Sequence, residues 1–233
     1  MSSPAYCRPL AYDALRRELP LLSTRRGLVR AACAVASHEA GESEAALALK
    51  SLDAMVEAVR SRTPSESPDA LLAHMHDVMF DLLEFGGNKD DYYNPSNSYL
   101  PVVLATRRGI PITLAIVYKY VAAELGLTVH GVNSPGHFLV AVETEEAHQR
   151  SLMFVDPFYG GTLLSLPEAF DRIAQTTGTH IEPDPQLLAP ASHRTWIARL
   201  LMNLTAIFAR AGREKDLYAM QELLDLVEQE HVV

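Results

Sequence analysis

The chain has 233 residues, of which 48% are hydrophobic and 21% are charged, and its formal net charge is −9 at pH 7. This length and composition fit an ordinary globular protein, with one large domain or a core plus an appendage. The acidic balance disfavours nucleic acid binding, because a phosphate backbone would be repelled on average. With neither a membrane-length apolar run nor a signal-peptide pattern, no membrane contact is expected and the cytoplasm is the expected location.

Residues 1–66 are expected to form an N-terminal helical region. Apolar residues recur at helical spacing over 28–36 and again over 47–59. The segment 62–68, with two prolines among small polar residues, predicts a loop or a minor boundary. A further amphipathic helix is predicted from about Asp69, and Phe85-Gly86-Gly87 is expected to end it, since glycine readily adopts the left-handed cap conformation.

Residues 88–100 are polar and aromatic and predict an ordered loop, because tyrosine and asparagine offer hydrogen-bonding groups at little cost in side-chain entropy. The candidate ligand-binding residues are Tyr92, Tyr93, Asn97 and Tyr99 in this loop, with Thr113 beyond it. The four loop side chains could form one wall of a concave site for a small molecule or a peptide. The alternative, that they satisfy backbone groups within a long loop, stays open at this point.

Residues 112–125 are apolar nearly all round, which predicts a helix buried on most of its faces. Pro111 suits the first turn of this helix, and Gly126 stands where a cap glycine belongs. Short strands are predicted over 128–133, 137–143 and 151–155, with a charged hairpin loop at 145–150. A short strand and a helix near 167–176 are predicted to follow Gly160-Gly161.

Residues 181–233 are expected to form a linker and a C-terminal helical hairpin. The proline-rich stretch 182–190 predicts the linker. Beyond it, two apolar stripes at helical spacing are separated by Ala211-Gly212, which predicts two antiparallel helices of tetratricopeptide-like form. Because fewer than three such repeats cannot stand alone, the hairpin is expected to dock on the core or on a partner.

Cys7 and Cys33 are the only cysteines, so neither a disulfide framework nor a cysteine metal motif is predicted. Cys33 lies among small apolar residues typical of a packed helix, whereas Cys7 lies in a proline-flanked segment that is expected to be mobile. Neither context supplies the electropositive surroundings of a reactive thiol, so neither cysteine is favoured as a nucleophile.

Several motifs occur in one order along the chain and together resemble a known family. They are Gly86-Gly-Asn-Lys-Asp-Asp-Tyr-Tyr93, Asn97-Ser-Tyr-Leu100, Arg107-Arg-Gly-Ile-Pro-Ile-Thr-Leu-Ala115, Pro135-Gly-His-Phe-Leu139 and Val155-Asp-Pro-Phe158. The chain resembles the SirB-type transglutaminase-like family over about residues 47–174 and, more loosely, through the C-terminal hairpin. The resemblance implies an α+β fold with a papain/transglutaminase-like core, placed at 67–180, in which a central helix packs against an antiparallel sheet.

The resemblance also implies the positions of a catalytic triad, one member of which is missing. The superfamily's cysteine falls on Pro111, its histidine on His137 and its aspartate on Asp156. A thiol at a helix start is activated by the helix dipole and by a neighbouring imidazole, whereas proline has neither a nucleophile nor a backbone N–H. Only a neighbouring hydroxyl, such as that of Thr113, could replace the thiol.

The hydroxyl groups near this position have simpler interpretations. Thr113 is placed to bond within the first helical turn, and a hydroxyl titrates far above neutrality unless a base is aimed at it. Ser98 and Ser134 are interpreted as turn residues.

His137 and Asp156 admit three interpretations. The carboxylate can fix the tautomer of the imidazole in a structural or ligand-docking pair. The pair can instead perform acid–base chemistry. A metal site completed by a neighbour such as His130 would lack a tight ligand cluster, so no metal and no cofactor are predicted.

The sequence predicts a non-catalytic, pseudoenzyme-like protein that binds a peptide or protein partner. The predicted binding surfaces are the groove around His137 and Asp156 and the C-terminal hairpin. The alternative is a hydrolase or acyl-transfer enzyme in which His137 is a general base on water and Asp156 orients it. A structural module with its old site filled by side chains is the third hypothesis.

Overall fold

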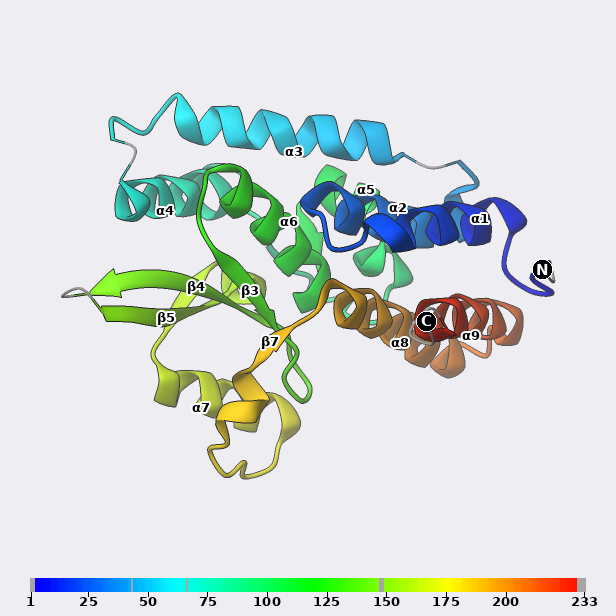
Figure 1. Ribbon diagram of the computed structural model, residues 1–233. Coiled ribbons are helices and arrows are strands. Elements are labelled where there is room, and N and C mark those ends of the chain that lie inside the picture. The colour runs from blue at the N-terminus through cyan, green and yellow to red at the C-terminus, as the bar shows by residue number, and fades with distance from the viewer. Residues whose placement is uncertain (1–2, 43, 66, 147–148, 230–233) are drawn as a thin grey trace.

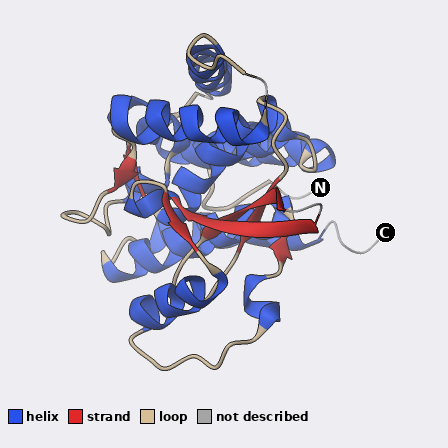
Figure 2. Ribbon diagram, turned by 90° about the vertical axis from the view of Figure 1, so that its left-hand side faces the viewer, coloured by secondary structure: helices blue, strands red, loops and turns tan. Residues whose placement is uncertain are grey.

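The computed structural model describes residues 3–42, 44–65, 67–146 and 149–229 and has an α+β fold (Figure 1). A five-stranded antiparallel sheet lies between a thick layer of helices and a thinner one (Figure 2). The fold class predicted from the sequence is therefore confirmed.

Three helices form the N-terminal part: α1 (Pro9–Glu18), α2 (Arg25–Ala40) and α3 (Ala45–Arg60). The Thr24 side chain accepts a hydrogen bond from the N–H of Gly27 (2.9 Å) and so caps the first turn of α2. Most of α2 is buried, because α1, α3 and α8 (His193–Arg210) pack around it. The helices predicted at 28–36 and 47–59 are confirmed, whereas α1 had not been predicted.

The expectation of a mobile segment around Cys7 is wrong. The Cys7 side chain is buried, and Glu222 in α9 (Glu214–Gln229) accepts hydrogen bonds from the backbone N–H groups of Ala5 (2.7 Å) and Cys7 (2.8 Å). A carboxylate distant in sequence thus holds the segment that precedes α1. Cys33 is buried as predicted, and burial raises the pKa of both thiols to about 12, so both stay protonated near neutral pH.

The helix α4 (Pro68–His76) continues into a π-helical segment, Asp77–Leu82. The predicted glycine cap after it is wrong, because Glu84 carries the positive φ of 55° and Gly86–Gly87 forms strand β1 instead. β1 pairs in parallel with β2 (Arg108–Gly109). Gly87 is required by a close approach, since a Cβ there would stand 2.4 Å from the Phe158 ring.

The central helix is α6 (Pro111–Glu124), which follows a 3-10 turn, Pro95–Ser98, and a short helix, α5 (Leu100–Thr106). Side chains are buried on all sides of α6, as the apolar pattern predicted. Gly126 follows it with a φ of 89°, which confirms the expected cap glycine.

The strands are β3 (Val129–Val132), β4 (Leu139–Glu146), β5 (Gln149–Asp156), β6 (Thr162–Leu164) and β7 (Pro190–Ala191), in the spatial order β6-β5-β4-β3-β7. Alternate side chains face opposite sides, so Val140 and Val142 join the main core with α6 while Leu139 and Ala141 pack in a second core with α7 (Leu166–Thr177). The charged loop predicted at 145–150 is shorter than expected, because β4 reaches Glu146 and β5 begins at Gln149. Residues 147–148 lie outside the described residues.

The C-terminal hairpin of α8 and α9 docks on the core, which is one of the two outcomes that the sequence left open. Trp196 is fully buried, and its ring lies 4.8 Å from that of Phe138. Gly131 in β3 leaves the space for this indole. The stretch predicted as a linker also supplies strand β7, which pairs with β3, and the carbonyl of Ala191 accepts a hydrogen bond from Trp196 Nε1 (3.2 Å).

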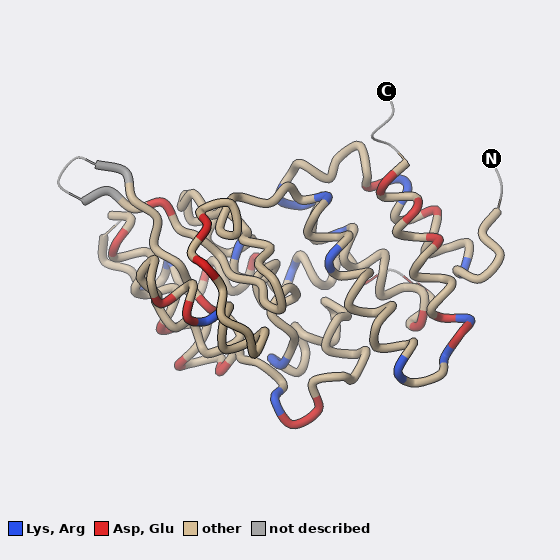
Figure 3. Tube along the Cα trace, turned by 90° about the horizontal axis from the view of Figure 1, so that it is seen from below, with Lys and Arg blue, Asp and Glu red and all other residues tan. Residues whose placement is uncertain are grey.

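Figure 3 shows Lys and Arg interspersed with Asp and Glu along the chain, in keeping with the scattered basic pairs of the sequence. Within the described ranges, no helix is long and apolar enough to cross a membrane.

The contact between Gly131 and Trp196 gives a stability prediction. A Cβ at position 131 would stand 2.0 Å from the indole, so Gly131→Ala should lower the free energy of unfolding by about 2–3 kcal/mol through overpacking. Gly86→Ala is the matched control, because nothing lies within 4 Å of a Cβ there. Urea unfolding measures both, and equal losses in the two variants would contradict the packing argument.

A second prediction concerns pH and rests on His76. Its Nε2 lies 2.8 Å from the Tyr118 hydroxyl, and burial lowers its pKa to about 4. Because the folded-state pKa lies below the unfolded value near 6.5, the unfolded chain takes up the proton first, and stability should fall as the pH drops from about 6.5 towards 4.

The loss attributable to His76 should be on the order of 2–3 kcal/mol. His76→Gln should flatten the dependence of the unfolding free energy on pH over this range. His180→Gln, at an exposed side chain, serves as the control and should retain the wild-type dependence. An unchanged slope in His76→Gln would show that other groups carry the acid sensitivity.

Candidate functional site

Two neighbouring antiparallel strands bring His137 and Asp156 together. His137 stands just before β4, after a turn in which Gly136 has a φ of 68° and the Ser134 hydroxyl donates to the His137 carbonyl (3.1 Å). Asp156 is the last residue of β5. His137 Nε2 lies 3.0 Å from Asp156 Oδ2, and the two residues are 3% and 0% exposed.

The Asp156 carboxylate has hydrogen-bonding partners at both of its oxygens. Oδ1 accepts from the backbone N–H groups of Phe158 (3.1 Å) and Tyr159 (3.4 Å), and so caps the 3-10 turn Pro157–Tyr159. Oδ2 meets His137 and also lies 3.4 Å from Nε of Arg172. The arginine supplies the positive charge that a buried carboxylate requires.

Aromatic rings cover the pair. The ring centroids of Phe158 and Tyr159 lie 6.1 and 6.2 Å from that of His137. Cations lie over Tyr159 in turn, with the Arg172 guanidinium 4.0 Å and Lys89 Nζ 4.4 Å from its ring centroid. His137 is therefore enclosed, and the open part of the site lies beyond Tyr159, which is 41% exposed.

The start of α6 carries Pro111 at the position that the resemblance assigns to the superfamily's thiol, and no free hydroxyl is seen beside it among the described residues. Pro111 is its first residue and is buried. Thr113 Oγ1 accepts from the Ile110 N–H (3.2 Å), and its single proton is shared by the carbonyls of Asn97 (2.8 Å) and Ile110 (3.0 Å). A hydroxyl held on three sides by backbone caps the helix and is not aimed at His137.

The hydroxyl groups of Ser134 and Ser98 are also not free to act as nucleophiles. Ser134 donates to the His137 carbonyl, as a turn residue would. Ser98 is fully buried, and its hydroxyl has no hydrogen-bond partner among the described residues.

The four loop residues do not form one wall. Tyr92 packs edge-on against Phe158, with 5.8 Å between ring centroids, and so reaches the site. Tyr93 is exposed and lies beneath the guanidinium of Arg210, 4.1 Å from it, at the C-terminal end of α8.

Asn97 and Tyr99 are turned into the protein. The Asn97 amide donates to the carbonyls of Asp91 (2.7 Å) and Tyr92 (3.2 Å) and therefore braces the loop. Tyr99 is buried, and burial together with the nearby Glu39 on α2 raises its pKa.

A cleft of about 660 Å³ opens beside the covered pair, and we call it the Tyr159 cleft. Its lining includes Phe80, Gly87, Lys89, Arg108, Tyr159 and Arg172. The Arg108 guanidinium donates to the carbonyl of Glu84, the residue with the left-handed backbone, and so fixes one rim. Sequence reasoning had not singled out these lining residues individually, although Lys89, Arg108 and Phe158 lie within its motifs.

Among the described residues, no third metal-ligating side chain joins His137 and Asp156. Over the described ranges, no three His, Cys, Asp or Glu side chains gather as metal ligands would. His130, considered as a third ligand, instead lies 2.7 Å from Glu143 through its Nε2. The His130 and Glu143 side chains are each 33% exposed, whereas His137 and Asp156 are buried.

Comparison with known proteins agrees with this geometry. The sequence profile described as the Transglutaminase-like superfamily matches residues 46–202. A UPF0162 protein of Xylella fastidiosa (strain 9a5c) is 36% identical over 199 residues, which are 84% of this chain and 67% of that protein. A UPF0162 protein of Pseudomonas aeruginosa is 29% identical over 212 residues, 88% of this chain and 71% of that protein.

The similarity extends to part of a longer human protein. F-box only protein 21 is 30% identical over 165 residues, which are 69% of this chain and 25% of that protein. No solved structure matches the chain significantly. The profile match covers more than half of the chain and includes the central helix and both members of the His–Asp pair, so the chain belongs to the transglutaminase-like superfamily.

Proposed function

We propose that this protein is a non-catalytic member of its superfamily, of the SirB type, that binds a peptide or a segment of a protein partner in the Tyr159 cleft. Two observations together carry the proposal. Pro111 stands at the position assigned to the nucleophile, and His137 is only 3% exposed. Covalent chemistry needs a nucleophile and an accessible base, and this site presents neither. The adjoining cleft stays open.

The chemistry of the cleft suits an extended peptide segment. Gly86, where a Cβ would have no atom within 4 Å, leaves room for another backbone, and Phe80 and Tyr159 offer aromatic surface for a side-chain anchor. Lys89, Arg108 and Arg172 outnumber Glu84 and Asp90 in the lining, so the cleft favours an acidic group next to that anchor. An acidic residue beside an aromatic or aliphatic one is therefore the recognition element that we infer.

The C-terminal hairpin contributes to this proposal through its outer surface. Its apolar stripe, with Trp196 and Leu200 fully buried, is occupied by the core. Met202 is exposed on α8 and is available to a larger partner.

The enzyme hypothesis retains one favourable observation. Asp156 holds Nε2 of His137, and among the described residues no hydrogen bond to Nδ1 is seen. That nitrogen is the one that would accept a proton from water in a hydrolase or acyl-transfer enzyme. The aromatic cover over the ring would have to open for such a reaction.

Peptide binding can be tested directly. Hexapeptides enriched from a random phage library on the purified protein should bind Tyr159→Ala about tenfold more weakly, since truncation removes the central aromatic contact. Tyr218→Ala is the matched control, because Tyr218 is similarly exposed (44%) but lies on α9. Fluorescence polarisation gives the dissociation constants. Failure to enrich any peptide, or equal affinity in the two variants, would refute binding in this cleft.

The absence of turnover is a separate expectation. Wild type should not hydrolyse a library of fluorogenic peptide amides above the buffer rate. His137→Gln keeps a donor for Asp156 but removes the base, and His130→Gln alters the other histidine–carboxylate pair. Hydrolysis that survives His130→Gln and disappears in His137→Gln would establish the enzyme hypothesis in place of ours.

A further inference from the structure

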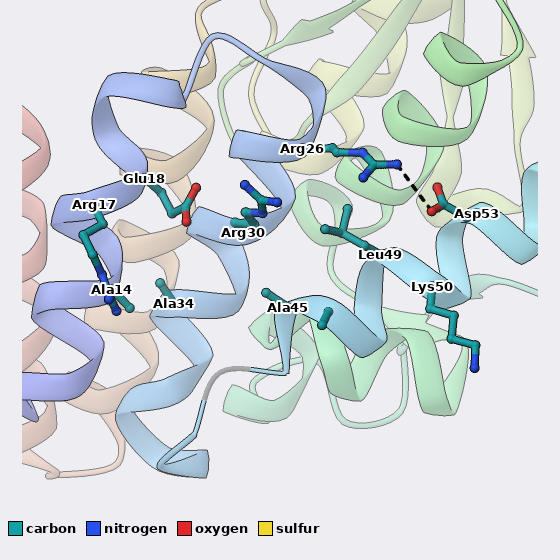
Figure 4. A pocket seen from close by; sticks show the side chains of 11 residues that line it. Ala14, Arg17, Glu18, Arg26, Arg30, Ala34, Ala45, Leu49, Lys50 and Asp53 are labelled. Carbon is teal, nitrogen blue, oxygen red and sulfur yellow. Dashed lines mark ion pairs between the residues drawn. The ribbon is translucent and has the colours of Figure 1, made fainter.

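A second hollow lies among the N-terminal helices, away from the Tyr159 cleft. It has a volume of about 560 Å³ and is bounded by α1, α2 and α3 (Figure 4). Its floor is made of small apolar side chains, Ala14 on α1, Ala34 on α2 and Ala45 on α3, together with Leu49. Because alanines stand where longer side chains would fill the space between helices, room remains for a small organic molecule.

The rim of this hollow is positively charged, although the chain as a whole is acidic. Arg17, Arg26, Arg30 and Lys50 line it, against two carboxylates, Glu18 and Asp53. Four cations and two anions leave a formal charge of +2 in a chain whose net charge is −9. The hollow is thus a local site of attraction for anions.

Three of these six charged side chains already have partners. Arg26 forms an ion pair with Asp53 (3.6 Å), and Asp53 also accepts a hydrogen bond from the Tyr120 hydroxyl (2.6 Å). Nε of Arg17 donates to the carbonyl of Asp13 (3.2 Å). These contacts hold the walls of the hollow in place.

Arg30 and Glu18 differ from these three residues. Figure 4 shows Arg30 between Glu18 and the Arg26–Asp53 pair. Arg30 is half-buried, and within the described residues its guanidinium has no ion pair or hydrogen bond. Glu18 Oε2 is buried and has no donor among those residues either. An unsatisfied guanidinium and an unsatisfied carboxylate oxygen in one hollow call for a ligand that has an acidic group and an N–H or O–H donor.

We propose that this hollow binds a small amphipathic anion. Its apolar body lies on the alanine floor, its acidic group accepts hydrogen bonds from Arg30, and its donor meets Glu18. A bare inorganic anion would leave the apolar floor wet, and an uncharged apolar molecule would leave Arg30 unpaired. The site shares no lining residue with the Tyr159 cleft, so it stands independently of the peptide proposal.

Anilinonaphthalene sulfonate (ANS) is a suitable probe, because it combines an apolar ring system, a sulfonate and an N–H group. We expect saturable fluorescence enhancement with one molecule bound per chain. Arg30→Gln should weaken binding about tenfold through loss of a charge-assisted hydrogen bond.

Two further variants distinguish binding in this hollow from nonspecific binding of ANS elsewhere on the surface. Ala45→Phe, at a half-buried position, should fill the hollow and weaken ANS binding at least about tenfold. Lys215→Gln removes an exposed cation on α9 and should leave binding unchanged. Circular dichroism confirms that each variant is folded. If Arg30→Gln and Ala45→Phe bind like wild type, ANS lies elsewhere, for example on the exposed Leu163 and Leu166, and the proposal is overturned.

Displacement of ANS then identifies the acidic group. Octanoate and octyl phosphate present the same apolar chain with a carboxylate or a phosphate, and the stronger competitor shows which head group the site prefers. Inorganic phosphate at the same concentration should not compete. Equal displacement by inorganic phosphate would show a simple anion site and would overturn the amphipathic part of the proposal.

Discussion

A fully buried carboxylate, that of Asp156, is the constraint around which the rest of the site is arranged. A charge at 0% exposure is tolerated only when its oxygens are satisfied, and this requirement fixes His137, Arg172 and the amides of the turn that follows β5. Because the same turn carries Phe158 and Tyr159, satisfying the carboxylate also places two aromatic rings beside the imidazole. The same turn therefore satisfies the Asp156 carboxylate and covers the His137 ring.

The C-terminal hairpin helps to bury the central helix. α6 is apolar on all sides, so the sheet alone cannot bury it, and α8 supplies part of what remains. Trp196 reaches Phe138 through the gap that Gly131 leaves in β3, while Glu222 binds the segment before α1. One apolar core thus contains side chains from 1–66, 67–180 and 181–233. The boundaries between these three regions remain predictions from the sequence, because side chains from all three pack together in this core.

Sequence patterns predicted what depends on local periodicity. The apolar run of α6, the alternation in β4 and β5 and the paired motifs around His137 and Asp156 were all visible without coordinates. What they missed depends on distant partners. Glu84 takes the left-handed conformation although glycines follow it, and Arg108, from another strand, donates to its carbonyl. Cys7 is buried because of Glu222, and 190–191 becomes a strand because β3 offers an unpaired edge. Asn97 and Tyr99 turn inward for reasons that the composition of their loop does not encode.

The presence of a His–Asp pair does not by itself require catalysis. Replacing His137 by an apolar residue would withdraw one partner from a buried carboxylate, and breaking such an arrangement costs on the order of 3–5 kcal/mol. The imidazole has a structural task that is independent of any substrate. The thiol position has no comparable task, since a proline at the first turn of a helix is well tolerated and needs no hydrogen bond. Physical chemistry thus separates the three positions: loss of the nucleophile leaves the fold intact, whereas loss of either member of the pair would strain it. If the protein is non-catalytic, as we propose, Pro111 can take the place of the nucleophile while the His–Asp pair retains the shape of the site.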